Sequence, residues 1–460
     1  MEIAGRKALV LGAGKSGIAS AKFLAERGAT VALHDKKPVE EWTEKARVLN
    51  QSHKIGLMSD QIPSWLLDQI DLVVISPGVP TNTIPARYVD RKDGEVIGEV
   101  ELAYRFMKGR IVGITGSNGK TTTTTLVGEL LKDSAITTQV GGNIGTPLLS
   151  LADSSHKDGW TVVELSSFQL ETIVDFRPNV AACLNVTPNH LDRYESFTDY
   201  AAAKHRIFMN QTADDVAILN ADDEITSTWK QGLKATVTMF SVQRELEDGL
   251  FLRGRELVCR SSGKEKVLTT RDRIAIRGLH NVENVLASLA VGLACGASPD
   301  SMAETIANFG GVEHRMELVA EIDGVKFYND SKATSVDATL KALEALSEDE
   351  GKVNLILGGR GKNAPYEPLA ELIERKVRRL IVLGEDADNI TSQLKAFAEI
   401  ERADSLSESV KMAFASAVSG DSVLLAPACA SFDMFKSFEE RGDVFKEEVV
   451  KLRSKEAATK

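Results

Sequence analysis

Short runs of apolar residues recur along the chain and alternate with segments whose apolar residues have helical spacing. In the first part, the runs Lys7–Leu11, Thr30–His34 and Asp71–Ile75 are bounded by glycine or polar residues, and a helical pattern follows at Glu99–Met107. Continuous apolar runs of this length are typical of strands that are buried on both faces of a parallel sheet. The pattern therefore predicts an alternating α/β block.

The same alternation continues through the rest of the chain. After a run at Arg110, the predicted strands are Trp160–Leu165, Val180–Asn185, Val216–Asn220, a hairpin at Leu250–Val258, Val325–Tyr328, Val353–Leu357, Leu380–Leu383 and Ser422–Leu425. The predicted helices are Asn281–Ala294, Val336–Leu346 and Phe435–Leu452. The second block starts at Arg110 and the third follows Gly310-Gly311. We therefore expect an α/β fold with three domains, at 1–108, 109–309 and 310–460.

Composition narrows the possible functions. Of the 460 residues, 43% are hydrophobic, and the formal net charge is −11 at pH 7. An acidic chain argues against nucleic-acid binding, which favours a basic face. The sequence has no apolar run of 18 residues, its N-terminus lacks a secretory pattern, and its four scattered cysteines suit a reducing compartment. We expect a cytoplasmic, monomeric enzyme without nucleic-acid partners and without membrane insertion.

The most informative segment is Arg110–Thr125, RIVGITGSNGKTTTTT. An apolar strand leads into glycines, a Lys-Thr pair and the start of a helix. This order is typical of a phosphate-binding loop, in which backbone N–H groups and a lysine hold a polyphosphate and a hydroxyl ligates Mg²⁺. Ile114 stands where the common pattern has its first glycine. A glycine-rich turn with a chance lysine is the alternative to this prediction of ATP or GTP binding.

Another glycine loop, which is the first along the chain, is Gly12-Ala-Gly14-Lys-Ser-Gly17, and it follows the first predicted strand. A helix and a strand come next, and that strand ends before Asp35. Strand, GxGxxG, helix, strand and acidic residue is the pattern of dinucleotide-binding domains, in which the helix N-terminus holds a pyrophosphate and the acid bonds a ribose. Taken alone, this pattern suggests NAD and an oxidoreductase.

Polar residues cluster where two central strands are predicted to end. Glu164 ends one run and precedes a Ser-Ser turn. A carboxylate one strand away from a phosphate loop suits a Mg²⁺ ligand, and a helix cap in the Ser-Ser turn is the alternative. After the next strand, His190 shares the strand end with Asp192 and Arg193. The neighbouring charged residues favour a functional role for His190 over a purely structural one.

These segments together resemble the Mur ligases, an ATP-dependent amide-forming family. The matching motifs occur in order as GITGSNGKTTT, ELSSFQL, NVTPNHLDRY, NADD at Asn220–Asp223, LHNVEN at Leu279–Asn284 and GGVEHR at Gly310–Arg315. The later segments Tyr328–Thr334, Leu357–Asn363 and Ala426–Asp433 are similar to members that add D-glutamate. Two departures are visible, since Asn189 stands where the family often has Asp, and Ala426 where Ser is frequent.

The resemblance implies three domains, which are a Rossmann-like N-terminal domain, a P-loop ATPase-like central domain and a Rossmann-like C-terminal domain. It implies ATP-dependent ligation of D-glutamate to UDP-N-acetylmuramoyl-L-alanine, through an acyl phosphate and with two Mg²⁺ ions, in the synthesis of peptidoglycan precursors. It also changes the expected ligand of the first glycine loop, because the N-terminal domain of this family holds UDP rather than NAD.

The resemblance also assigns roles to residues. Expected ATP contacts are Gly116, Ser117, Asn118, Gly119, Lys120, Thr121, Thr122, Asn281, Asn284, Arg315, Asp330 and Lys332. Expected contacts to the UDP-substrate are Gly14, Lys15, Ser16, Asp35, Ser76, Pro77, Gly78, Asn143 and Ser167. Expected D-glutamate contacts are Thr334, Lys362, Ser431 and Phe432, with a helix cap at Ser431 and a solvated charge at Lys362 as alternatives. Expected catalytic residues are Lys120, Glu164, His190 and Lys204, and expected Mg²⁺ ligands are Thr121, Glu164, His190 and Lys204.

Lys204 lies in the segment Tyr200–Arg206, YAAAKHR, which by itself predicts an amphipathic helix with a surface lysine. The resemblance implies instead that Lys204 is carbamylated. A neutral lysine amine takes up CO₂, and the carbamate offers two anionic oxygens to a metal ion. Three other functions stay open on the residues alone: an amide ligase of the folylpolyglutamate synthase type, an NAD oxidoreductase, and a non-catalytic P-loop module.

Overall fold

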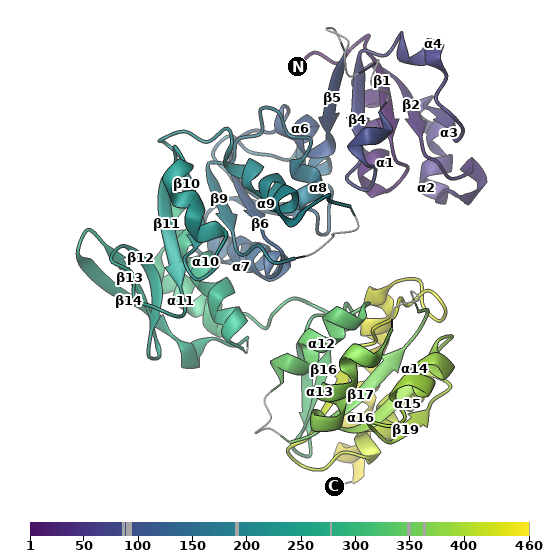
Figure 1. The fold of residues 1–460 in the computed structure, drawn as a ribbon, viewed down its shortest axis with the longest axis vertical. Helices are drawn as coiled ribbons and strands as arrows, with labels where there is room; N and C mark the ends of the chain where they lie inside the picture. The colour runs from purple at the N-terminus through teal and green to yellow at the C-terminus, as the bar shows by residue number, and fades with distance from the viewer. Residues whose placement is uncertain are drawn as a thin grey trace. The chain divides into compact units, whose positions relative to one another are not determined.

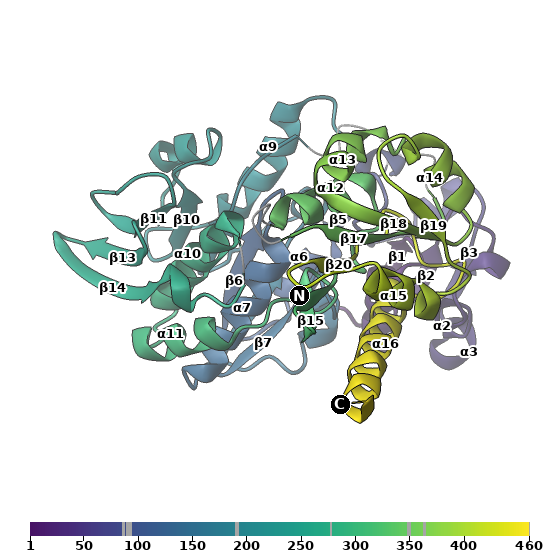
Figure 2. The same cartoon turned by 90° about the horizontal axis from the view of Figure 1, so that it is seen from below.

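The computed structural model describes residues 1–84, 88, 94–188, 193–276, 278–346, 351–361 and 365–459. Within these residues the strands form three sheets, and the chain divides into two compact units (Figures 1 and 2). The first unit comprises Met1–Ile274 and Leu279–Asn308, and the second comprises Ala275–Gly278 and Phe309–Lys460. Among the helices of the described residues, none has both the length and the apolar character needed to cross a membrane.

The first sheet is parallel, with the strand order β3-β2-β1-β4-β5. Its strands are β1 Lys7–Leu11, β2 Thr30–His34, β3 Gly56–Met58, β4 Leu72–Ile75 and β5 Glu95–Gly98. The helices of this part are α1 Lys15–Glu26, α2 Glu44–Arg47, α3 Leu49–His53, α4 Ser64–Leu67 and α6 Glu99–Tyr104. The strand order reverses at β1, between β2 and β4, which is where open α/β sheets bind ligands.

The second sheet has the order β14-β13-β12-β11-β10-β9-β6-β8-β7. Its strands are β6 Arg110–Thr115, β7 Thr138–Gly142, β8 Trp160–Glu164, β9 Val180–Cys183, β10 Val216–Asn220, β11 Thr236–Ser241, β12 Gly249–Arg253, β13 Glu256–Ser261 and β14 Lys264–Thr270. Its helices are α7 Lys120–Asp133, α8 Ser167–Leu170, α9 Phe197–His205, α10 Leu279–Ala294 and α11 Pro299–Asn308. The pairs β12–β13 and β13–β14 are antiparallel, and β6 lies in parallel between β9 and β8. The segment after β6 therefore emerges from the interior of the sheet.

The third sheet belongs to the second unit and has the order β15-β16-β20-β17-β18-β19. Its strands are β15 Glu317–Ile322, β16 Val325–Asn329, β17 Val353–Gly358, β18 Val377–Leu383, β19 Ile400–Arg402 and β20 Ser422–Leu425. Its helices are α12 Val336–Ala345, α13 Ala370–Lys376, α14 Ala387–Leu394, α15 Leu406–Ala415 and α16 Phe438–Thr459. Leu355 and Leu357 of β17 belong to one apolar cluster and Ile356 to another, because successive side chains of a strand face opposite sides. Helices therefore cover both faces of this sheet.

The predicted α/β alternation and the hairpin after Gly249 are confirmed, with small differences at the ends of elements. The last helix was expected at Phe435–Leu452 and runs over Phe438–Thr459. The apolar pattern does not predict β3, β5, β7, β11, β14, β15 and β19, and each of these strands contains exposed or half-buried residues. The domain limits at 108 and 309 remain predictions.

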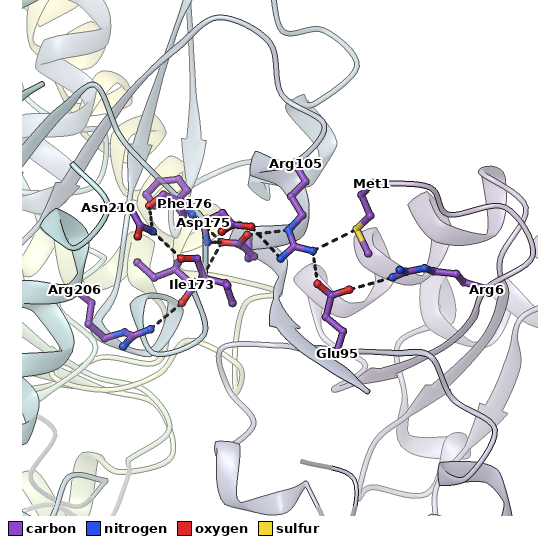
Figure 3. A network of polar contacts seen from close by, with 11 residues as sticks. Met1, Arg6, Glu95, Arg105, Ile173, Asp175, Phe176, Arg206 and Asn210 are labelled. Carbon is purple, nitrogen blue, oxygen red and sulfur yellow. Dashed lines mark hydrogen bonds and ion pairs between the residues drawn. The ribbon is translucent and has the colours of Figure 1, made fainter. Parts of the chain in front are cut away.

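A network of polar contacts joins the first sheet to the second within the first unit (Figure 3). Arg105, directly after α6, pairs with Glu95 of β5, and its guanidinium lies 3.6 Å from the Asp175 carboxylate. Arg6 pairs with the other oxygen of Glu95 at 3.0 Å. Glu101 is fully buried, pairs with Arg105 at 2.9 Å, and accepts three backbone hydrogen bonds from residues 174–176 at 2.9, 3.1 and 2.9 Å. A buried carboxylate with this many partners holds α6 firmly against the second sheet.

Candidate active site

The predicted phosphate loop connects β6 to α7. Gly116 and Gly119 have φ angles of 153° and 81°, a region that side-chain-bearing residues rarely adopt. Asn185, after the neighbouring strand β9, holds the loop: its backbone carbonyl accepts the Ser117 N–H at 2.9 Å, and its side-chain oxygen accepts the Asn118 N–H at 2.8 Å. The shape of the loop is therefore set by an adjacent strand end.

Lys120 is the first residue of α7, and Thr121 and Thr122 follow it in the buried first turn. The Lys120 ammonium donates to the backbone carbonyls of Gly116 and Ser117 at 2.9 and 3.0 Å. A lysine at a helix N-terminus beside a glycine-rich loop concentrates positive charge where a polyphosphate binds.

Asn281 and Asn284 of α10 lie at the same loop. A Cβ added at Gly119 would stand 2.2 Å from the side-chain oxygen of Asn284, so only glycine permits this approach. The Asn284 amide donates to the side-chain oxygen of Asn281 at 3.1 Å. The fold thus brings together the expected ATP contacts that belong to the first unit.

Glu164 ends β8, directly beside the phosphate-loop strand, with Ile114 as its partner in the register. Its side chain is 2% exposed. One carboxylate oxygen accepts a hydrogen bond from the Asn143 amide at 2.8 Å, and the other is buried without a partner among the described residues. The alternative of a helix cap in the Ser-Ser turn is also present, because Ser166 caps α8 and forms a capping box with Gln169, and this cap does not use the Glu164 carboxylate.

Lys204 lies on α9 and is 2% exposed, so its alternative interpretation as a surface lysine is wrong. Its ammonium donates to the Gly116 carbonyl at 2.8 Å and lies 4.6 Å from the centre of the Tyr200 ring. Burial, together with the nearby charge of Lys120, lowers the pKa of Lys204 to about 7. Two lysines therefore share one loop carbonyl, and one of them is readily neutral.

A cavity of about 1060 Å³ opens at the carboxyl ends of β1, β2 and β4 in the first unit. Eight of the expected UDP-substrate contacts line it, namely Gly14, Lys15, Ser16, Asp35, Ser76, Pro77, Gly78 and Asn143. Ser167 lies outside this lining, at the buried start of α8. The Asp35 carboxylate accepts the Ala13 N–H at 2.8 Å and the Lys37 N–H at 3.1 Å, so it also shapes the glycine loop.

Other cavity-lining residues were not among the expected UDP-substrate contacts, although Gly12 begins the predicted glycine loop. They are Leu11, Gly12, His34, Lys36, Ser59, Asp60, Gln61, Ile62, Val79, Pro80, Thr83, Gly142, Gly145, Pro147 and Gln169. The segment 59–62 directly follows β3, so the rule that ligands bind at strand ends would have found it if β3 had been predicted.

Asn143 connects the cavity to the phosphate loop. It lines the cavity, its backbone N–H donates to the Glu164 carbonyl at 2.9 Å, and its side chain donates to the Glu164 carboxylate. The Asn143 side chain thus links one end of the cavity, which has the size needed for a nucleotide-sugar, to the buried Glu164 carboxylate beside the phosphate loop.

The second unit gathers the remaining expected contacts that the structure describes. Asp330 is buried after β16, and burial raises its pKa to about 6 although Arg315 acts in the opposite direction. Arg315 and Lys332 both act electrostatically on this carboxyl. The Ala428 N–H donates to the Ala333 carbonyl at 2.9 Å, which joins the segment of Asp330 and Thr334 to the loop after β20.

That loop carries Ser431, which is buried, and Phe432, whose side chain is 63% exposed. Its base is held by Tyr366, whose hydroxyl donates to the Asp386 carboxylate at 2.6 Å and lies 3.0 Å from the Cys429 sulfur. His190 and Lys362 lie outside the described residues.

Three family models match the chain in order. They are the Mur ligase MurD-like N-terminal domain over residues 6–98, the Mur ligase middle domain over 114–292, and the Mur ligase glutamate ligase domain over 314–429. The chain belongs to the Mur ligase family. The match confirms the predicted three-domain fold and argues against the oxidoreductase and the non-catalytic P-loop module. The N-terminal match also argues against the folylpolyglutamate synthase alternative.

Relatives with curated names match over nearly the full length. A UDP-N-acetylmuramoylalanine–D-glutamate ligase of Koribacter versatilis is 46% identical over 458 residues, which cover 99% of this chain and 100% of the relative. A protein of the same name from Pelotomaculum thermopropionicum is 44% identical over 97% of this chain and 98% of the relative.

Solved structures support the same fold. The UDP-N-acetylmuramate-alanine ligase of Thermotoga maritima has a TM-score of 0.58 at 22% identity, covering 97% of this chain and 99% of that one. A pseudomurein peptide ligase type C of Methanothermus fervidus has a TM-score of 0.56 at 18% identity, covering 97% and 100%. At these identities the likeness concerns the fold alone.

Proposed function

We propose that this Mur ligase uses ATP to join D-glutamate to UDP-N-acetylmuramoyl-L-alanine, in the cytoplasmic synthesis of peptidoglycan precursors. The observation that carries the proposal is the path from the cavity through Asn143 to Glu164 and the phosphate loop. A substrate whose UDP lies by the first glycine loop would extend its acyl end toward this path. The names of the relatives at 46% and 44% identity agree with this assignment.

The reaction needs activation of the acceptor carboxylate and binding of the ATP phosphates. ATP supplies the phosphoryl group that turns a poorly reactive carboxylate into an acyl phosphate, which the D-glutamate amine then attacks. Lys120 and the loop N–H groups would hold the phosphates, because this step needs positive charge and alignment more than an acid–base pair. Asn281 and Asn284, with Arg315, Asp330 and Lys332 of the second unit, complete the proposed ATP contacts.

Magnesium fits the donor set beside the loop. The buried oxygen of Glu164 that has no partner among the described residues and the hydroxyl of Thr121 are the hard oxygen ligands that Mg²⁺ prefers. We assign two ions to Thr121, Glu164, His190 and Lys204, with Lys204 carbamylated. The ions would offset negative charge on the phosphates and on the acceptor carboxylate.

The amino-acid substrate is assigned to the second unit. Thr334, Lys362, Ser431 and Phe432 would hold D-glutamate, and the hydroxyls and the lysine suit its two carboxylates. The proposal also keeps domain limits at 108 and 309 and a monomeric enzyme.

The test is release of ADP by the purified protein with UDP-N-acetylmuramoyl-L-alanine and a panel of amino acids. D-glutamate should support turnover, with product of the expected mass, while L-glutamate and L-alanine should be nearly inactive, because a site of paired polar contacts strongly rejects ligands that leave them unpaired. Lys120→Ala serves as the matched inactive variant. Equal rates with L-glutamate, or ADP release that does not require the UDP-substrate, would contradict the assignment.

A further inference from the structure

Arg193 makes an unusual set of contacts in the first unit. One guanidinium nitrogen donates to the backbone carbonyl of Pro77 at 3.0 Å, and another lies 3.5 Å from the Glu171 carboxylate. The guanidinium carbon stands 3.9 Å from the centre of the Phe168 ring. The side chain is 19% exposed. A planar cation can meet a carbonyl, a carboxylate and a ring face at once, which a lysine cannot do.

Pro77 belongs to the wall of the cavity. It lies between Ser76 and Gly78 in the turn after β4, and all three residues line the cavity. The Ser76 hydroxyl donates to the Gly12 carbonyl at 3.3 Å, so this turn also contacts the first glycine loop. A contact that holds the Pro77 carbonyl therefore also holds the part of the cavity wall that lies beside the glycine loop.

The other side of Arg193 is anchored near the phosphate loop. The Tyr194 hydroxyl donates to Glu171, and the Tyr194 ring stacks on Phe168 with centres 6.0 Å apart. Tyr194 also packs edge-on against Tyr200 at 5.3 Å, and the Tyr200 hydroxyl lies 3.0 Å from the Ser117 hydroxyl. Arg193 thus extends from a ring cluster beside the phosphate loop to the wall of the cavity.

We propose that Arg193 is a positioning residue for the nucleotide-sugar substrate, because it holds the turn Ser76–Gly78 in the conformation that closes on the UDP group. The inference rests on the proposed function for the identity of the ligand. It adds a residue from the segment between β9 and α9 to a cavity whose expected contacts come mainly from the part of the chain around the first sheet. The Glu171 carboxylate orients the guanidinium, and the Phe168 ring packs against the face of the guanidinium.

The test compares Arg193→Ala and Arg193→Lys with Arg27→Ala. Arg27 is a matched control. Its guanidinium carbon lies 3.4 Å from the centre of the Phe23 ring, and its guanidinium pairs with the Asp153 carboxylate. None of these three residues lines the cavity. Both Arg193 variants should raise the KM for the UDP-substrate about tenfold or more, as expected for loss of a charge-assisted hydrogen bond, and leave the KM for ATP and D-glutamate unchanged. Arg27→Ala should leave all three KM values unchanged.

Calorimetric titration with UDP alone separates this inference from the proposed function. If Arg193 positions the cavity wall, the Kd for UDP should rise in both variants even if the wild-type protein shows no ligase turnover. Melting temperatures of all variants identify a general loss of structure, and Glu171→Gln, which keeps the volume of the side chain, should give a smaller rise of the same kind. An unchanged KM and Kd, or equal rises for all three substrates, would overturn the inference.

Discussion

Lys204 offers the sharpest test of the chemistry beside the phosphate loop. Its pKa falls from the usual 10.5 to about 7, first because it is buried and second because Lys120 is close. At pH 8 a group with this pKa is about 90% neutral, against about 0.3% at the usual pKa, a difference of about 300-fold in the reactive form. In the proposed carbamylation, the neutral amine would attack CO₂ and release one proton, which would leave a carbamate with two anionic oxygens.

The perturbation is Lys204→Ala, measured by ADP release and by carbon NMR in ¹³C-bicarbonate. The wild-type protein should show a carbamate resonance, and the variant should lack it and lose about 100-fold or more in kcat, because the substitution removes the proposed metal ligand. Acetate should restore part of the activity by filling the vacated space with a carboxylate. Lys376→Ala is the matched control, since Lys376 is also a buried lysine but bonds to backbone carbonyls of Leu343 and Leu346 in the second unit.

Two results would refute this reasoning. A Lys204→Ala variant with normal turnover would show that the residue has no part in the reaction. A carbamate resonance that is absent from active wild-type protein, or that persists in Lys204→Ala and disappears in Lys376→Ala, would show that the lowered pKa does not lead to carbamylation at this site.

Three further predictions follow from single residues. Burial raises the pKa of Glu99 to about 7. The free energy of unfolding is therefore highest at low pH, where Glu99 is protonated, and it falls by about 3 kcal/mol as the pH rises from 4.5 through 7. In thermal melts, Glu99→Gln should show a smaller loss of Tm between pH 5 and 8 than the wild type. Tyr366→Phe removes the hydroxyl that holds Asp386 at 2.6 Å, and it should raise the KM for D-glutamate severalfold without changing that for the UDP-substrate. Asp35→Ala should raise the KM for the UDP-substrate and spare that for ATP, while Lys120→Ala should do the reverse and lower kcat severely; equal effects on both substrates would contradict separate sites.

Local pattern alone predicted a large part of the fold and one functional element. The central strands β1, β4, β8, β9, β17 and β20 have continuous apolar runs because both of their faces are buried, and this property is visible without any tertiary information. The phosphate loop is equally local, since its glycines, lysine and helix are consecutive in the chain. Glu164 could be placed beside it because parallel strands end at one edge of a sheet.

The remaining features depend on packing between distant segments. The pattern around Lys204 is that of an ordinary amphipathic helix, and only its burial in the fold, together with the nearby charge of Lys120, lowers the pKa of the amine. The segment 59–62 lies in the cavity wall because β3 pairs with β2, and the apolar pattern of the sequence does not predict this pairing. The contact of Arg193 with Pro77 spans 116 positions in the chain. Hydrophobic periodicity indicates which face of an element is buried, but not which other element covers that face. The desolvation of a side chain and its long-range hydrogen bonds depend on which element covers it, so only the tertiary structure determines them.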